Sequence, residues 1–241
     1  MEELSAGVIE RGLQTRIVGR RVVYYPSVGS TNEVGKEAVR RGAEEGTVIV
    51  TEEQTTGKGR LKRAWLTPKG NIALSVLLYP PSERLYHLIM LSSLAVAHTI
   101  DKMTGLKSEI KWPNDVLIGS KKVCGILIEN DIGNGFVHAV IGIGINVKLD
   151  PAASSDFLAA ATSLNREAGR EISRVDLVRT LLVELDRLYD TLISSPHELY
   201  EMWSHRLGTL GKKVRVTSGD EVTEGVAESV GEDGSLRLRL G

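Results

Sequence analysis

The segment Phe136–Ile145, FVHAVIGIGI, constrains the fold most, because it is apolar at nearly every position. A strand that is apolar on both faces is normally covered on both faces. A second apolar run, Lys122–Glu129, precedes it, with a predicted turn at Asn130–Gly135 between them. We therefore expect these two strands at the centre of a sheet, with helices packed on it.

The remaining elements alternate around these two strands. Further strands are predicted at Arg21–Tyr25, Thr47–Thr51, Asn71–Leu78, Glu109–Trp112 and Val116–Ile118. Helices are predicted to begin after Ser30, Ser82, Ser173 and Ser195. Ser30 with Glu33, and Ser195 with Glu198, have the spacing of capping boxes. After Gly208 only short strands and turns follow, so we place a boundary there, giving domains 1–208 and 209–241.

Composition excludes several classes of protein. The 241 residues carry a net charge of -1, whereas a general nucleic-acid coat or a membrane-surface binder needs a basic excess. The N-terminus has no apolar signal segment, and no run approaches the roughly 18 apolar residues of a membrane span. The single cysteine, Cys124, allows no intrachain disulfide and no Cys-based zinc site. We therefore expect a cytoplasmic protein. The near-zero net charge does not exclude a local basic site.

The loop Gln54–Arg63, QTTGKGRLKR, carries four cations and no acidic residue. Gly57 and Gly59 allow the backbone to approach a ligand closely. Clustered cations on such a loop suit a phosphate or a carboxylate, and arginine can bind either one through two parallel hydrogen bonds. On composition alone, a solvated surface loop with chance charges is the first interpretation, because short basic stretches are common.

A second polar cluster, Lys111-Trp-Pro-Asn-Asp115, follows a short strand. Its lysine could meet phosphate oxygens and its carboxylate could meet Mg²⁺, although Asn114 and Asp115 also suit an ordinary turn. Lys122 opens an apolar strand, where a lysine either extends to solvent or points into a pocket. The glycines of Gly142-Ile-Gly-Ile-Asn146 are consistent with close helix packing.

The order of these motifs is more specific than any one of them. Five motifs in this order together resemble the biotin protein ligases: Ser30-Thr31-Asn32, Gln54-x-x-Gly57-Lys58-Gly59-Arg60-x-x-Arg63-x-Trp65, Lys111-Trp-Pro-Asn-Asp115, Lys122-x-x-Gly125 and Gly142-x-Gly-x-Asn146. The resemblance implies an α+β fold: a mixed central sheet flanked by helices, similar to class II aminoacyl-tRNA synthetases, with a small SH3-like β domain at the C-terminus. Residues 209–241 are a strand or more shorter than a typical domain of that kind.

The resemblance also implies roles for individual residues. The biotin side comprises Ser30, Thr31, Asn32, Gln54, Gly57, Lys58, Gly59, Arg60 and Lys122. The ATP side comprises Arg63, Trp65, Lys111, Asn114, Asp115 and Asn146, with Asp115 also a candidate Mg²⁺ ligand. Arg60, Lys111 and Lys122 would stabilise the charge of the reacting groups. Lys58 stands where many members have arginine, which keeps the charge but loses the planar fork.

The implied activity is that of a monofunctional ligase. Biotin and ATP would give biotinyl-5′-AMP and pyrophosphate, and a lysine of a biotin carboxyl carrier protein, as in acetyl-CoA carboxylase, would then take the biotin. Two alternatives are a lipoate or octanoate ligase and a non-catalytic biotin sensor. About 20 residues precede the first predicted strand, whereas a helix-turn-helix domain needs roughly 50, so we expect no sequence-specific DNA binding. By analogy we expect a homodimer.

Overall fold

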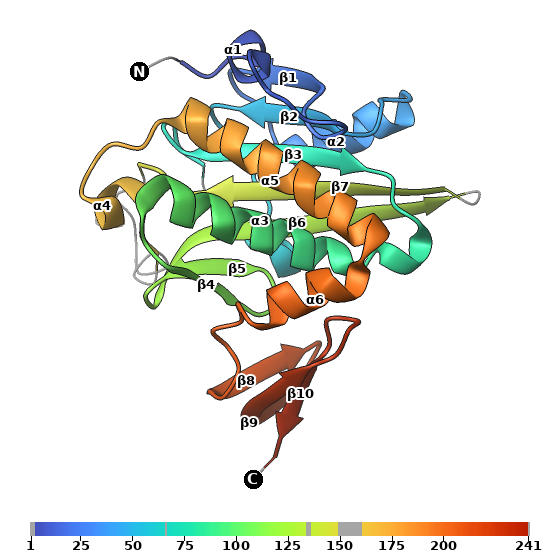
Figure 1. The fold of residues 1–241 in the computed structure, drawn as a ribbon, viewed down its shortest axis with the longest axis vertical. Coiled ribbons are helices and arrows are strands. Elements are labelled where there is room, and N and C mark those ends of the chain that lie inside the picture. Colours follow the sequence, from blue (N-terminus) through green and yellow to red (C-terminus); the bar gives the residue numbers. More distant parts are fainter. Residues whose placement is uncertain (1–2, 66, 134–135, 149–160, 241) are drawn as a thin grey trace.

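A seven-stranded mixed sheet forms the main body of the chain in a computed structural model that describes residues 3–65, 67–133, 136–148 and 161–240 (Figure 1). The first two strands pair in parallel, and the remaining five neighbouring pairs are antiparallel. From one edge to the other the strands are β1 (Arg21–Tyr25), β2 (Thr47–Thr51), β3 (Ile72–Leu78), β7 (Phe136–Ile145), β6 (Lys121–Gly133), β5 (Asp115–Ile118) and β4 (Ser108–Lys111). The predicted central position of β6 and β7 is confirmed.

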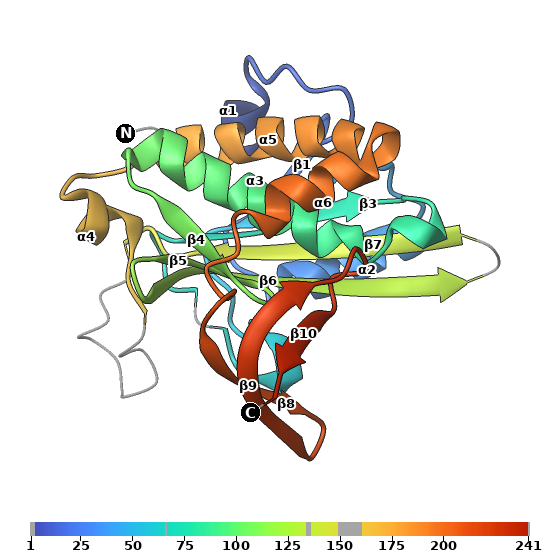
Figure 2. The same ribbon diagram turned by 60° about the horizontal axis from the view of Figure 1, so that its bottom comes forward.

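Helices cover both faces of this sheet (Figure 2). The helices α3 (His87–Thr104), α5 (Arg174–Ser194) and α6 (Pro196–Ser204) lie on one face, and α2 (Thr31–Arg40) lies on the other. The shorter elements are α1 (Ala6–Glu10), α4 (Leu164–Ala168) and two 3₁₀ turns, η1 (Arg60–Lys62) and η2 (Ser82–Arg84). Every residue of β2 and β3 is buried between these layers. None of the described helices is both long and apolar enough to cross a membrane.

A separate three-stranded antiparallel sheet follows α6. It comprises β8 (Lys213–Ser218), β9 (Glu221–Val230) and β10 (Leu236–Arg239), in the order β10-β9-β8. Trp112 ties it to the main body, since its indole Nε1 donates to the Gly234 carbonyl at 2.9 Å. The Tyr200 hydroxyl on α6 donates to the Val230 carbonyl, also at 2.9 Å. This change of sheet supports the division at residues 208 and 209, which stays a proposal.

The segment before β1 is anchored by one carboxylate of α5. Asp186, which is nearly fully buried, accepts hydrogen bonds from three consecutive backbone N–H groups. The donors are Arg16 at 2.7 Å, Ile17 at 2.8 Å and Val18 at 2.8 Å. Because a buried backbone N–H must be paired, this one side chain fixes the position of residues 16–18, which lead into β1.

Three local predictions are wrong. Ser30 and Ser195 do precede helices, but neither hydroxyl makes a capping hydrogen bond, whereas the Ser173 hydroxyl accepts from the Asp176 N–H. The predicted turn at Asn130–Gly135 is displaced, because β6 continues to pair with β7 as far as Gly133. The long helix after Ser82 begins only at His87, preceded by a 3₁₀ turn. The sequence also favours a loop over residues 150–156, and this stretch lies outside the described residues.

Candidate functional site

One cavity of about 860 Å³ collects the predicted site residues from segments far apart in the sequence. Every residue predicted for the site except Gly57 lines it. These are Ser30, Thr31, Asn32, Gln54, Lys58, Gly59, Arg60, Arg63, Trp65, Lys111, Asn114, Asp115, Lys122 and Asn146. They come from the start of α2, the loop after β2, the connection from β4 to β5, and strands β6 and β7.

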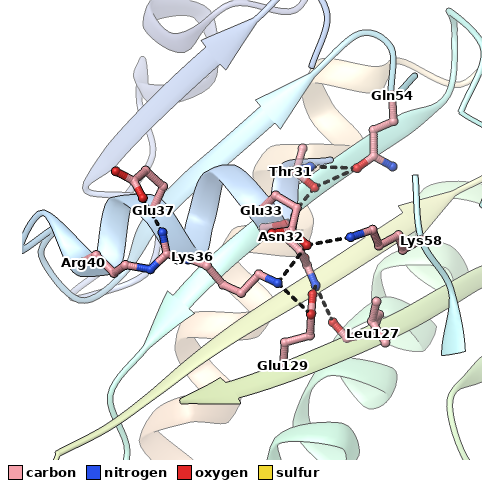
Figure 3. Close-up of polar contacts among 11 residues, drawn as sticks. Thr31, Asn32, Glu33, Lys36, Glu37, Arg40, Gln54, Lys58, Leu127 and Glu129 are labelled. Carbon is pink, nitrogen blue, oxygen red and sulfur yellow. Dashed lines mark hydrogen bonds and ion pairs between the residues drawn. The ribbon is translucent and has the colours of Figure 1, made fainter. Parts of the chain in front are cut away.

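One end of the cavity is built from hydroxyl and amide groups (Figure 3). The Gln54 Oε1 accepts from the Thr31 N–H at 2.9 Å and from the Thr31 hydroxyl at 3.2 Å, so it is tied to the first turn of α2. Gly57 stands behind this amide rather than in the wall. A Cβ there would lie 2.4 Å from the Trp65 carbonyl oxygen and 2.9 Å from the Gln54 Nε2, so only glycine fits.

A polar chain beneath this end involves two residues that the sequence analysis missed. The Asn32 Oδ1 accepts from the Ser75 hydroxyl at 2.7 Å, and its Nδ2 donates to Glu129 Oε2 at 2.8 Å. Gly142 leaves the space, since a Cβ there would lie 2.3 Å from the Asn32 Oδ1. Ser75 is the only polar residue in the apolar run of β3, which is the signal that could have found it.

The other end of the cavity is charged. The Lys122 Nζ lies 2.6 Å from the Asp115 Oδ1 and 5.1 Å from the centre of the Trp65 ring. Trp65 reaches this position because β7 carries glycine opposite it. A Cβ on Gly144 would lie 2.2 Å from the Trp65 Nε1. The interpretation of these glycines as helix-packing residues is therefore incomplete, since Gly144 makes room for a side chain of the loop.

The basic loop forms a narrow tongue, which we call the strap and define as residues Gly57–Trp65. Two backbone hydrogen bonds close it: Gly59 N–H to the Arg63 carbonyl at 2.7 Å, and Trp65 N–H to the Gly57 carbonyl at 2.9 Å. At its tip Leu61 adopts a left-handed conformation with φ of 55° and is exposed. Most of the strap's residues line the cavity, so it is a wall of the site rather than an unrelated surface loop.

Asn114 connects its own turn to the sheet and to the strap. Its Nδ2 donates at 2.8 Å to the carbonyl of Ile126, twelve residues away on β6, and not to the local backbone of the turn. Its Oδ1 accepts from the Arg60 guanidinium at 3.2 Å, so it also holds the strap. Asn146, at the end of β7, is buried and donates to the Thr162 carbonyl at 3.1 Å. Both amides are thus fixed in orientation before any ligand binds.

The small C-terminal sheet contributes a wall that the sequence analysis missed. Arg215, Val216 and Thr217, all on β8, line the cavity. No sequence signal pointed to them, because the pattern of β8 is that of an ordinary half-exposed strand. Their place in the site follows from how the Trp112 and Tyr200 hydrogen bonds seat the small sheet against the main body.

The charge of the cavity differs sharply from that of the chain. Its described lining residues include six cations and one acid, although the chain as a whole has a net charge of -1. The cations are Lys58, Arg60, Arg63, Lys111, Lys122 and Arg215, and the acid is Asp115. This imbalance suits a ligand with several negative charges, such as a polyphosphate. Within the described ranges no three His, Cys, Asp or Glu side chains gather as a metal site.

Comparison with known proteins gives consistent results. The family model described as "Biotin/lipoate A/B protein ligase family" matches residues 24–146. The chain is 34% identical over 243 residues to the "Bifunctional ligase/repressor BirA" of Bacillus subtilis, covering 98% of this chain and 74% of that protein. It is 31% identical over 261 residues to the "Biotin--[acetyl-CoA-carboxylase] ligase" of Mycobacterium tuberculosis, covering 100% of this chain and 93% of that protein.

A solved structure has the same fold. The biotin protein ligase of Aquifex aeolicus, crystallised in complex with biotin and ATP, superposes with a TM-score of 0.78 at 26% identity. The superposition covers 91% of each chain. The mixed sheet flanked by helices, and the small antiparallel sheet at the C-terminus, therefore match a known arrangement.

Proposed function

This chain belongs to the biotin/lipoate A/B protein ligase family, and from this premise we propose that it is an ATP-dependent biotin–protein ligase. Biotin is activated when its carboxylate attacks the α-phosphate of ATP, which gives biotinyl-5′-AMP and releases pyrophosphate. A lysine amine of an acceptor protein then attacks the acyl carbon and displaces AMP. The observation that carries the proposal is one cavity with an amide-lined end and an end rich in cations.

The amide-lined end suits the ureido ring of biotin. That ring has two N–H donors and one carbonyl acceptor, so it needs polar partners that are held in place. Thr31 and Gln54 already hydrogen-bond to one another, whereas the hydroxyl of Ser30, which borders the cavity, makes no capping hydrogen bond to α2. The Ser30 hydroxyl is therefore the group that we expect to hydrogen-bond to the ring. Asn32 is held at this end by its hydrogen bond from the Ser75 hydroxyl.

The charged end suits the triphosphate and the reacting groups. Lys122 lies at this charged end beside Asp115, and we assign its ammonium to the biotin carboxylate and then to the charge that develops on the α-phosphate. Arg60 and Lys111 add positive charge around the same atoms, and Arg63, Trp65, Asn114 and Asn146 surround the nucleotide. Catalysis of this kind needs positioning and preorganised charge more than covalent help from the protein.

Magnesium fits this donor set as a companion of the phosphates. Mg²⁺ is commonly bound through one or two carboxylates together with substrate phosphates. Asp115 is the only carboxylate among the described residues of the lining, and one of its oxygens is engaged by Lys122. Asp115 would therefore hold the ion on one side, and the ion would neutralise phosphate charge.

The choice of substrate distinguishes a biotin ligase from a lipoate or octanoate ligase. An aliphatic acid has no ureido group, so it leaves the amide-lined end unpaired, which costs binding free energy. The test incubates the purified chain with ATP, Mg²⁺ and either biotin or octanoate, and measures pyrophosphate release and labelling of a biotin carboxyl carrier domain. Release with biotin and acceptor labelling are expected. Equal or faster release with octanoate would overturn the assignment of biotin, and biotin binding without pyrophosphate release would favour a sensor.

Arg60→Gly is expected to release the intermediate more than it slows its synthesis. Arg60 holds the strap through Asn114, and glycine removes that hydrogen bond together with a cation over the reactive anhydride. The leaked biotinyl-5′-AMP should then acylate lysines of unrelated proteins. The measurement is biotin incorporation into serum albumin at equal pyrophosphate release. Labelling no greater than that by the unmodified enzyme would remove Arg60 as the residue that retains the intermediate.

A homodimer stays a prediction. The two edges of the sheet limit where a second copy could pair with it. The outer edge of β4 is covered, since the Ile110 N–H donates to the Arg206 carbonyl and the Gly208 N–H donates to the Ile110 carbonyl. β1 forms the other edge of the order. Its Val22 N–H donates to the Glu10 Oε1 at 2.8 Å, so the rest of β1 is what is left for pairing with a second copy. Light scattering should give twice the 26.2 kDa mass of one chain at micromolar concentration. A monomer mass throughout would contradict it.

Three further expectations also stay predictions. These are the biotin carboxyl carrier protein as acceptor, the cytoplasm as location and the absence of sequence-specific DNA binding.

A further inference from the structure

We propose that Glu33, on the first turn of α2, is a positioning residue that holds the strap over the cavity through Lys58. This inference rests on the proposed function, because the strap matters as the cover of the biotin and adenylate site. No role was expected for Glu33 beyond a helix cap, and Figure 3 shows it turned toward the strap instead.

The first observation is the ion pair itself. The Lys58 Nζ donates to the Glu33 Oε1 at 2.8 Å, which joins the strap to a helix of the main body. Two residues further on, beside the tip, the strap is held by Arg60, whose guanidinium donates to the Asn114 Oδ1 at 3.2 Å. The strap is therefore fastened at two points, one to α2 and one to the connection between β4 and β5.

The second observation is that Glu33 is itself held in place. The Lys36 Nζ donates to the Glu33 Oε1 at 2.8 Å and to the Glu129 Oε1 at 3.0 Å. Glu129 lies on β6 and also accepts from the Asn32 amide, so the row of ion pairs Lys58–Glu33–Lys36–Glu129 is anchored on the central sheet. Lys36 is more buried than Lys58 and Arg60, the two side chains that hold the strap, so it keeps Glu33 in place.

The charge state supports the same role. Hydrogen bonds from Lys36, and then from Lys58, lower the pKa of Glu33 to about 2. The carboxylate is therefore charged throughout the neutral range, and the ion pair is present under the conditions in which the enzyme works. Because the pair is half exposed, its strength depends on ionic strength.

The chain offers a matched control on the same helix. Glu37 lies one turn after Glu33 and is also paired with two cations, Arg40 and Arg41, as Figure 3 shows in part. Glu37 and its two partners all lie in α2 or at its C-cap, so these ion pairs do not connect Glu37 to the strap. Glu37→Gln removes an equivalent charge and an equivalent pair of ion pairs without touching the site.

The first test follows strap opening without substrate. Trypsin cuts after Arg60 and Arg63 when the strap leaves the surface, and mass spectrometry measures each product. Glu33→Gln should raise this cleavage rate about threefold to fivefold, the range that an exposed ion pair supports, and Glu37→Gln should not. Added NaCl should accelerate cleavage of the unmodified chain and leave Glu33→Gln unchanged. Equal cleavage of both variants and the unmodified chain would overturn the proposal.

A double-mutant cycle tests whether Glu33 acts through Lys58. In a Lys58→Met background, Glu33→Gln should add nothing to cleavage after Arg60 or Arg63, because the pair is already broken. Fully additive effects would contradict the proposed connection. In pyrophosphate release, Glu33→Gln should raise the KM for biotin about threefold to fivefold and leave kcat within about twofold, since part of the strap's order is then lost on binding. A lowered kcat with unchanged KM would contradict it.

The two proposals fail separately. Trypsin cleavage needs neither biotin nor ATP, so the fastening of the strap can be established or refuted even if the chain makes no adenylate. Absence of pyrophosphate release by the unmodified chain would refute the ligase assignment and leave the cleavage result standing.

Discussion

Replacing Lys122 with alanine should slow pyrophosphate release by about 30-fold to nearly 1,000-fold, which corresponds to a loss of about 2–4 kcal/mol of transition-state stabilisation. The ammonium lies at the charged end of the cavity, 2.6 Å from the Asp115 Oδ1 and 5.1 Å from the centre of the Trp65 ring. Alanine removes the charge that would meet both the biotin carboxylate and the reacting phosphate. It also leaves the partly buried Asp115 without its cation.

The neighbouring lysine provides the control. Lys121 begins the same strand but is exposed and does not line the cavity, so Lys121→Ala should leave the rate within about twofold. Thermal melts of both variants separate catalysis from folding. Near-normal turnover of Lys122→Ala would remove Lys122 from the mechanism, and so would a fall in melting temperature large enough to explain the lost rate.

The second large effect concerns stability rather than catalysis. Asp186→Ala should lower the free energy of unfolding by about 3 kcal/mol, because three backbone N–H groups lose a charged acceptor. For a chain of this size that corresponds to a melting temperature lower by roughly 6–12 °C. Calorimetry or circular dichroism measures the shift.

Asp190, one turn further along α5, gives the comparison. It pairs with the Arg16 side chain at 2.8 Å, but both partners are largely exposed. Asp190→Ala should therefore change the free energy of unfolding by less than about 1 kcal/mol. If Asp186→Ala and Asp190→Ala have the same melting temperature, the three backbone hydrogen bonds do not anchor the segment before β1.

The sequence predicted the strands well because burial alone determines them. β7 could be placed at the centre of the sheet since apolar side chains on both faces leave no other environment for it. The end of β6 was missed because Asn130, Asp131 and Gly133 favour turns locally, whereas pairing with β7 satisfies the same backbone groups. Tertiary pairing outweighed the local preference.

The site divides in the same way. Residues within recognisable motifs, such as Gln54 and Lys122, could be placed in advance, and the cavity contains them. Glu33 was assigned to a helix cap because its spacing from Ser30 is that of a capping box. Its actual partners are lysines, one of which comes from a loop beyond β2, and no local pattern encodes that contact. Arg215 was missed for the same reason, whereas Ser75 did carry a local signal as the only polar residue of β3.

The position of β8 changes how the small C-terminal sheet should be regarded. Arg215, Val216 and Thr217 stand in the same wall as residues from the first half of the chain. Trp112, which belongs to the Lys-Trp-Pro-Asn-Asp run, both borders the cavity and carries the hydrogen bond that seats the small sheet. Both sheets therefore line the proposed active site, so the orientation of the small sheet shapes that cavity together with the motifs of the large one.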